Sequence, residues 1–326
     1  MPLSLRRGLV TAIHERHDSL IRLEVDGVAC VAYPSLTGSV ELEDEVLVNV
    51  QARELELGSG GFDVLYANLT RGLELSPEEG AHVMVLPYTP LQHARLFAEE
   101  SGEGEPELHG MPVVCCSLHS QLAPVCAALT GLRVAYVQLA GGALPVSLSD
   151  TVRTLRERGL VAATAAVAPC FDADAQCVSA ASALAWSRRE HDVAVCAIGP
   201  GIVGTGTRFG HGGLAAAEAA NTATALGGSP VLAVRVSSGD ERARHRGVSH
   251  HTRAVFELCL GEVSVAWPAG LDAPDWLDRR RELDVSEWRA ACDGLPLDHM
   301  GRGPDDDPWF FASAFAAGKL ARTLIP

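Results

Sequence analysis

The residues best suited to chemistry lie in one basic stretch, RVSSGDERARHRGVSHHT, over residues 235–252. Its candidate groups are Asp240, Arg242, Arg244, His245, Arg246, Ser249, His250 and His251. Arginine grips a phosphate or carboxylate through paired hydrogen bonds, and histidine exchanges protons near neutral pH. The chain has a formal net charge of −15, so this concentration of cations is unusual within it. The stretch therefore predicts a site for a small anionic ligand, with Arg244 and Arg246 neutralising its charge.

The same histidines lack the spacing of a zinc site. The chain has no HxxxH or HxH pair, although His119 together with His250 or His251 could offer two ligands. Neighbouring side chains point in different directions on a helix or a strand, so we expect at most one of His250 and His251 to face the ligand. No metal ligand is predicted, and the sequence leaves any cofactor unknown.

A glycine-rich stretch, GPGIVGTGTRFGHGG over residues 199–213, is the second candidate. Glycines keep side chains away, so that backbone N–H groups can wrap an anion. The expected ligand contacts are Gly199, Gly201, Gly204, Thr205, Gly206, Thr207 and Arg208. Three of these glycines match GxGxxG formally, but Gly206 and Gly210 stop a helix from starting at once, and no acidic residue follows at the distance of a dinucleotide fingerprint. No Gly-Lys-Ser/Thr follows for a P-loop.

The third candidate is SLHSQ over residues 117–121. His119 lies between Ser117 and Ser120 at the expected start of a helix, where a general acid or base and an anion are both favoured. A serine–histidine–acid triad can be assembled from Ser117 or Ser120 with His250 and Asp240, but the spacing does not single it out.

Apolar strand-like runs alternate with helix-length segments from residue 81 onward. The expected strands are 82–86, 112–116, 133–138, 162–168, 192–198 and 230–236, and the expected helices are 121–129, 149–158, 177–188 and 214–226, with Ser149 and Asp150 capping the second helix. This pattern predicts a three-layer α/β domain over residues 81–326 with a mostly parallel sheet and helices on both faces. The three candidate stretches each follow a strand, so we expect them to meet at the carboxyl edge of the sheet.

The first 75 residues differ, because short alternating segments are separated by turn residues. They predict a small all-β, barrel-like domain over residues 1–75, joined by an acidic linker. Near the other end, residues 278–283 are charged and expected to be helical, and residues 305–307 are expected to cap a closing helix over 309–324.

Composition excludes several classes of protein. Hydrophobic residues make up 47% of the 326 residues, which is typical of a globular chain. The acidic balance disfavours nucleic acid, and no apolar run is long enough for a membrane span. Nine cysteines without a CxxC pair, and an N-terminus without a signal-peptide pattern, predict a cytoplasmic protein. We expect a homodimer only because symmetric dimers are common.

The chain resembles an uncharacterised bacterial family, number 3866, defined only as a domain of unknown function. The matching segments are YPSLTG (33–38), YTPLQ (88–92), MPVVCCSLHSQLAPV (111–125), GPGIVGTGTRFG (199–210), RHRGVSHHT (244–252) and MGRGPDDDPWFF (300–311), together with Glu218 and Asn221. The resemblance covers nearly the whole chain and implies that these segments form a site. It implies no reaction.

Our leading hypothesis is a cytoplasmic hydrolase or transferase acting on a small phosphate- or carboxylate-bearing ligand, with His119 or His250 transferring a proton. An oxidoreductase that binds NAD(P) or flavin is the first alternative, on the formal GxGxxG match alone. The second alternative is a non-catalytic protein that binds a metabolite, or a partner through its N-terminal barrel.

Overall fold

The computed structural model describes residues 3–56, 60–71, 75–102, 107–277 and 280–326. The chain divides into two compact units, Met1–Ala94 and Arg95–Pro326. The sequence-based division at residues 75–81 remains a prediction about the folding domains.

The first unit contains a closed barrel with strand order β1-β2-β3-β5-β4. Its strands are β1 (Leu5–Arg16), β2 (Ile21–Val25), β3 (Val28–Ala32), β4 (Glu45–Asn49) and β5 (Asp63–Asn68). Neighbouring strands are antiparallel except for the parallel pair β3 and β5. Alternate residues of each strand point inward, as with Val46 and Val48 in β4, and form a small apolar core. The predicted barrel is confirmed.

The remaining elements of this unit are short. They are α1 (Pro34–Thr37), α2 (Gln51–Glu54) and the strands β6 (Val83–Val85) and β7 (His93–Arg95). The sequence predicts that residues 82–86 begin the large parallel sheet, and this is wrong, because β6 pairs with β7 in a separate two-stranded sheet.

The second unit is built on an eight-stranded sheet with order β11-β10-β9-β12-β8-β13-β16-β17. The strands are β8 (Pro112–Cys116), β9 (Val134–Leu139), β10 (Ala163–Val167), β11 (Ala175–Cys177), β12 (Val193–Ile198), β13 (Ser229–Ala233), β16 (Ser264–Pro268) and β17 (Arg280–Leu283). Every pairing in it is parallel. Residues 280–283, expected to be helical, instead form the edge strand β17.

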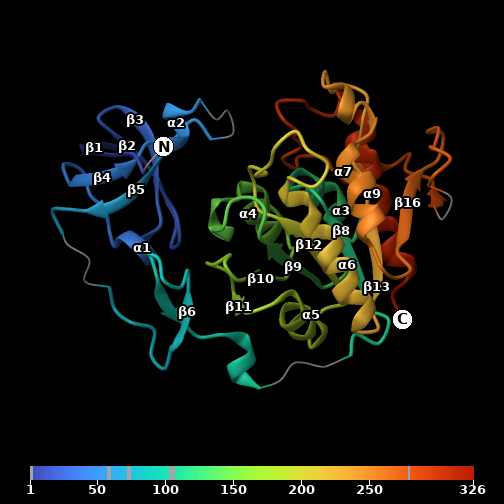
Figure 1. Ribbon diagram of the computed structural model, residues 1–326, viewed down its shortest axis with the longest axis horizontal. Helices are drawn as coiled ribbons and strands as arrows, with labels where there is room; N and C mark the ends of the chain where they lie inside the picture. The colour runs from blue at the N-terminus through green and yellow to red at the C-terminus, as the bar shows by residue number, and fades with distance from the viewer. Residues whose placement is uncertain (1–2, 57–59, 72–74, 103–106, 278–279) are drawn as a thin grey trace. The chain divides into compact units, whose positions relative to one another are not determined.

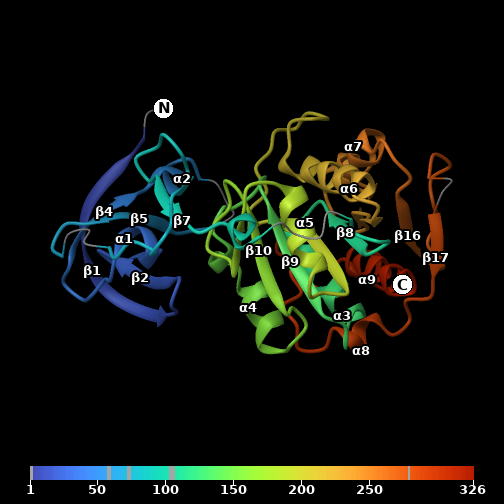
Figure 2. The ribbon, with the colours of Figure 1, turned by 90° about the horizontal axis from the view of Figure 1, so that it is seen from below.

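Helices cover both faces of this sheet, which confirms the predicted three-layer α/β fold (Figures 1 and 2). They are α3 (Leu122–Ala128), α4 (Asp150–Glu157), α5 (Ala180–Arg188), α6 (Ala215–Ala225), α7 (His250–Leu258), α8 (Trp288–Ala291) and α9 (Pro308–Thr323). Successive strand residues face opposite layers. Val114 and Cys116 of β8 pack with α3 and α9, whereas Val113 and Cys115 pack with α5 and α6.

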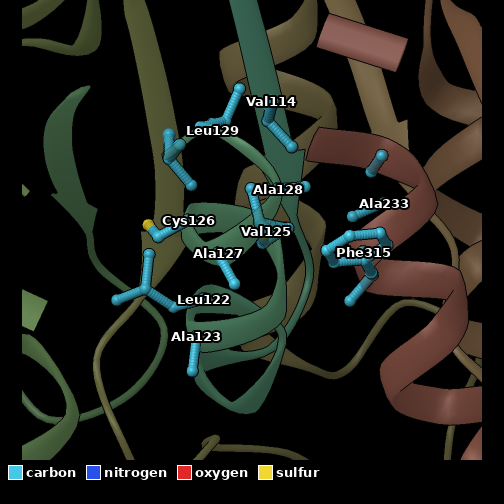
Figure 3. Close-up of a cluster of buried hydrophobic side chains, with 14 of the residues drawn as sticks. Val114, Leu122, Ala123, Val125, Cys126, Ala127, Ala128, Leu129, Ala233 and Phe315 are labelled. Carbon is cyan, nitrogen blue, oxygen red and sulfur yellow. The ribbon is translucent and has the colours of Figure 1, made fainter. Parts of the chain in front are cut away.

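The helix α9 packs most closely against α3 (Figure 3). Phe315 of α9 lies beside Val125 and Ala128 of α3 in the buried cluster. Gly318 permits the close approach, because a Cβ there would lie 2.4 Å from the Val125 carbonyl oxygen. Among the described residues, no helix has both the length and the apolarity to cross a membrane.

The strand order contains a switch point at β8 and β12, which are neighbours at the centre of the sheet. The chain leaves β8 toward β9 on one side, and it leaves β12 toward β13 on the other. Loops that diverge in this way open a crevice at the carboxyl ends of the strands, where α/β proteins bind ligands.

Candidate functional site

The loops that follow β8, β12 and β13 meet at this edge of the sheet. Gln121, after β8, donates from Nε2 to the carbonyl oxygens of Ala233 and Val234 at 3.0 and 3.1 Å. A Cβ on Gly213, in the loop after β12, would lie 2.8 Å from the Ser117 carbonyl oxygen. The three predicted stretches therefore do lie against one another.

His119 joins these loops rather than facing a ligand. Its Nδ1 lies 3.2 Å from the carbonyl oxygen of Ile198, to which it can only donate, so Nε2 accepts from the Ser149 hydroxyl at 2.7 Å. Ser149 in turn caps α4 by accepting from the Val152 N–H. Burial lowers the pKa of His119 to about 4, so the ring is neutral at pH 7. Both ring nitrogens are therefore engaged within the protein.

The two serines beside His119 are also engaged. The buried Ser117 donates to the Gln121 side-chain oxygen at 3.5 Å, and the Ser120 hydroxyl shares a hydrogen bond of 3.1 Å with Nδ1 of His299. The His299 ring stacks on Phe310 at 3.8 Å between centroids. Neither serine contacts His250, so the triad suggested by the sequence is not assembled.

The glycine-rich loop crosses the loop after β9 so closely that added side-chain atoms would collide with the opposite backbone. A Cβ on Gly199 would lie 2.1 Å from the Ala143 carbonyl oxygen, and a Cβ on Gly212 would lie 2.0 Å from that of Gly141. Gly201 has a φ of +70°, which favours glycine. This crossing explains why the sequence needs glycine here, whether or not an anion is bound.

The part of this loop between the crossings is exposed. Gly204 forms an isolated bridge with His211, and the Thr205 hydroxyl lies 2.8 Å from that of Thr207. A Cβ on Gly206 would meet nothing within 4 Å. Arg208 pairs with the Glu257 carboxylate of α7 and lies over the Phe209 ring. Its charge is therefore balanced inside the protein.

The centre of the site is a group of four imidazoles, which we call the histidine cluster: His211, His245, His250 and His251. The rings of His211 and His251 stack at 3.7 Å between centroids, and those of His250 and His251 lie 4.4 Å apart. His245 lies 4.9 Å from His250 and 4.8 Å from His251 by the same measure. The loop after β12 thus supplies one ring and the segment after β13 supplies three.

Local structure explains how two adjacent histidines enter one cluster. Ser249 caps α7 by accepting from the His251 N–H, and its hydroxyl lies 2.7 Å from Nδ1 of His245. His250 and His251 are the first two residues of α7, so both side chains can reach groups beyond the helix end. Both rings therefore lie in the cluster, and the expectation that at most one of them faces the ligand stays a prediction.

Several nitrogens of the cluster have no hydrogen-bond partner. Nε2 of His250 is buried and unpartnered, and neither ring nitrogen of His211 has a partner with good hydrogen-bond geometry, although the backbone of Arg208 lies near that ring. Burial lowers the pKa of all four imidazoles, to about 3 for His245, and the charge of Arg235 lowers each of them further. The cluster is therefore neutral at pH 7 and has unused polar atoms, which is rare inside proteins.

A network of ion pairs lies beside the histidine cluster and contacts it through Arg235. Arg235 is 1% exposed, and it donates to the Asp240 carboxylate at 3.2 Å and to Nδ1 of His251 at 3.3 Å. Asp240 also accepts from Arg242 and Arg302. The hydrogen bond from Arg242, outweighing burial, holds the pKa of Asp240 well below its usual range. Asp240 therefore positions arginines and does not orient a histidine.

Asp307, at the start of α9, completes this ionic network. Asp307 accepts from the Ser237 hydroxyl, the Ser238 N–H and Arg302. It occupies the cap position predicted for residues 305–307, but its side chain makes no capping hydrogen bond. Arg244 and Arg246 are exposed, and neither forms an ion pair within the described ranges of the chain.

Sequence reasoning missed His211, Arg235, His299, Arg302 and Asp307 as members of the site. His211 lies at the end of the glycine-rich stretch, and the last three lie in or beside MGRGPDDDPWFF. The position of Arg235 directly after a buried strand was a usable signal, because a charge there must be paired.

The fold and the site define a class: an α/β protein with a neutral histidine cluster and an arginine network at the switch point of its sheet. The chain belongs to a family described as a protein of unknown function (DUF3866), whose model matches residues 29–318. The family resemblance is thereby confirmed. A comparison with curated proteins gives no match.

Proposed function

We propose that the protein is an enzyme that binds a small phosphate- or carboxylate-bearing molecule at the carboxyl edge of its parallel sheet. The observation that carries the proposal is the pair Arg244 and Arg246, exposed and without acidic partners in the described ranges, beside the histidine cluster. The charge of Arg244 lowers the pKa of His250, so the guanidinium lies close to that imidazole. Arginines without acidic partners attract anions in a chain whose net charge is otherwise negative.

Two further features support anion binding. The N-terminus of α7 ends at the cluster, and the N–H groups and dipole at such an end favour negative charge. The neutral imidazoles can donate ring N–H groups to an anion without the desolvation cost of a charged side chain. Gly201, Gly204 and Gly206 keep the facing loop open, and a role for them in cradling the anion stays part of the proposal.

The enzymatic part of the proposal assigns hydrolytic or group-transfer chemistry. His250 is the most exposed ring of the cluster, and its lowered pKa leaves it neutral and able to accept a proton at pH 7. His119 is less suited to this role, because its ring nitrogens already bind Ile198 and Ser149. The dinucleotide alternative gains no support, because α6 begins at Ala215, well after the GxGxxG glycines.

A reducing, cytoplasmic location is part of the same proposal. All nine cysteines are free, and Cys115 and Cys196 lie directly opposite each other on neighbouring strands without forming a disulfide. Burial raises the pKa of Cys196 to about 12, so its thiol stays protonated and inert.

The test is calorimetric titration of the metal-free protein with inorganic phosphate, glycerol phosphate and citrate. We expect Arg244→Ala to weaken the preferred anion about tenfold to a hundredfold, since a charged hydrogen bond contributes roughly 1.5–3 kcal/mol. Arg133→Ala is the matched control, because this exposed arginine pairs with Glu190 at the opposite edge of the sheet. Equal affinity in Arg244→Ala and Arg133→Ala would remove the proposal.

A further inference from the structure

We propose that the histidine cluster is a binding site for a divalent transition metal of the Zn²⁺ class, held by His245, His250 and His251. One ring nitrogen from each of these residues lies within 4.8 Å of the others. Nitrogens that share a tetrahedral zinc ion at 2.0–2.1 Å are separated by about 3.4 Å, so small side-chain rotations close the difference.

Unpartnered nitrogens supply a second, independent observation. Nε2 of His250 is buried without a hydrogen-bond partner, and so are both ring nitrogens of His211, which is only 6% exposed and stacks on His251. An unpaired buried polar atom destabilises a fold by roughly 1–3 kcal/mol. Unpartnered nitrogens gathered in one cluster are the pattern expected of a site that binds a group from outside the polypeptide.

The orientation of the rings also suits a metal. The Ser249 hydroxyl can accept a hydrogen bond from the Nδ1–H of His245, which leaves Nε2 as the ligand atom. A metal-bound histidine usually donates its other N–H to an oxygen in this way.

His251 needs one adjustment to serve as a ligand. Arg235 donates to its Nδ1 at 3.3 Å, which places the ring proton on Nε2. Binding of a metal at Nε2 would move that proton to Nδ1 and lengthen the contact with Arg235. His211 lies against the other face of His251 and is the alternative donor, since both its nitrogens are unpartnered.

The surrounding charge determines what completes the coordination shell. Asp240 is shared by Arg235, Arg242 and Arg302, so the environment of the cluster is net positive. A dication there requires an anionic fourth ligand, either hydroxide derived from water or the anion of the proposed function. The metal site thus rests on the proposed function only for the identity of this fourth ligand. His250 would then be a metal ligand and not the proton acceptor.

The experiment uses the chain of 326 residues, stripped with EDTA and held in phosphate-free buffer, titrated with Co²⁺ and then with Zn²⁺. We expect one equivalent of Co²⁺ to produce visible d–d absorption that Zn²⁺ abolishes. Hyperfine-shifted imidazole N–H resonances in the Co²⁺ protein count the histidine ligands directly. His245→Gln and His250→Gln should each lower the metal affinity about tenfold or more. His191→Gln, a buried histidine that precedes β12 at the opposite edge, should change nothing.

Cooperative thermal melting of each metal-free variant confirms that it is folded. If a variant does not fold, the shifted resonances of the wild-type protein decide the ligand set. Absence of d–d absorption in the wild-type protein at millimolar Co²⁺, or full affinity in folded His245→Gln and His250→Gln, would overturn the metal site. Phosphate binding to the stripped protein is measured separately, so failure of one proposal is distinguishable from failure of the other.

Discussion

Two regions at the same edge of the sheet use similar residues in opposite ways. In the crossing around His119, Gly199 and Gly212, every ring nitrogen has a partner and the backbones touch. In the histidine cluster, whose His211 directly precedes Gly212, ring nitrogens are buried without partners. Burial of an imidazole is therefore no guide to its role, whereas the state of its hydrogen bonds is.

The difference has an energetic meaning. A paired buried histidine stabilises the fold, but an unpaired one destabilises it by roughly 1–3 kcal/mol. A chain tolerates that cost where a ligand recovers it. We therefore assign a structural role to the crossing and a ligand-binding role to the histidine cluster. Each of the following substitutions tests one of these roles.

The largest effect is expected for Gly212→Ala. Its Cβ would lie 2.0 Å from the Gly141 carbonyl oxygen, and the nearest atoms are all backbone of Gly141, which cannot rotate away as a side chain would. We expect a loss of about 3 kcal/mol or more in the free energy of unfolding, measured by urea denaturation. Gly206→Ala is the control, since its Cβ meets nothing within 4 Å and should change stability by no more than about 0.5 kcal/mol. Equal stability of the two variants would contradict a structural crossing.

A paired substitution of histidines gives the next effect. His119→Ala removes hydrogen bonds to Ile198 and Ser149 and leaves a void, so we expect a loss of about 3 kcal/mol. His211→Leu replaces a buried ring whose nitrogens have no partner with good hydrogen-bond geometry, and stability should change by less than about 1 kcal/mol or rise. Urea denaturation of both variants measures these changes. A larger loss of stability in His211→Leu than in His119→Ala would contradict the roles assigned to the two regions.

Acid should destabilise the crossing well above the pH at which carboxylates titrate. The pKa of His119 is about 4 in the folded protein and 6.5 when unfolded. Below pH 6.5 the unfolded chain therefore binds a proton that the native state does not, and stability falls as the pH drops toward 4. At pH 5 this one group contributes about 2 kcal/mol of destabilisation. The decrease in unfolding free energy from pH 7 to pH 5 should be smaller in His119→Gln than in the wild-type protein.

The smallest effect concerns Arg208, which the sequence places among the ligand contacts. Because Arg208 pairs with Glu257, we expect Arg208→Ala to leave phosphate affinity within about twofold and to lower stability by no more than about 1 kcal/mol. Titration calorimetry and denaturation measure both. A loss of affinity as large as that of Arg244→Ala would extend the ligand site into the glycine-rich loop.

The architecture was predictable because it depends on periodicity. The apolar run at 112–116 corresponds to β8, and Ser149 caps α4 as its position suggested. The edges of the sheet were not predictable in this way. β17 reads RREL because an edge strand is exposed and takes charges, and these residues suggested a surface helix.

The site was predictable only in outline. Strand ends correctly indicated which stretches would meet, since parallel strands bring their following loops to one edge. The roles within those stretches depended on partners distant in the chain. Ile198 engages His119, and Arg235 links Asp240 to His251. No local spacing encodes such contacts, which is why His211 was overlooked and His119 was favoured.

The position of α9 in the chain has a consequence for biosynthesis. This helix follows every strand of the sheet in sequence, yet it packs against α3, β8 and the strands beyond it. Until residues 308–323 leave the ribosome, Val125, Ala233 and their neighbours lack the cover that α9 provides. The nascent chain therefore exposes apolar surface at this stage, which makes it prone to aggregation and a target for chaperones. Completion of the fold and delivery of Asp307 to the arginine network then happen in the same late step.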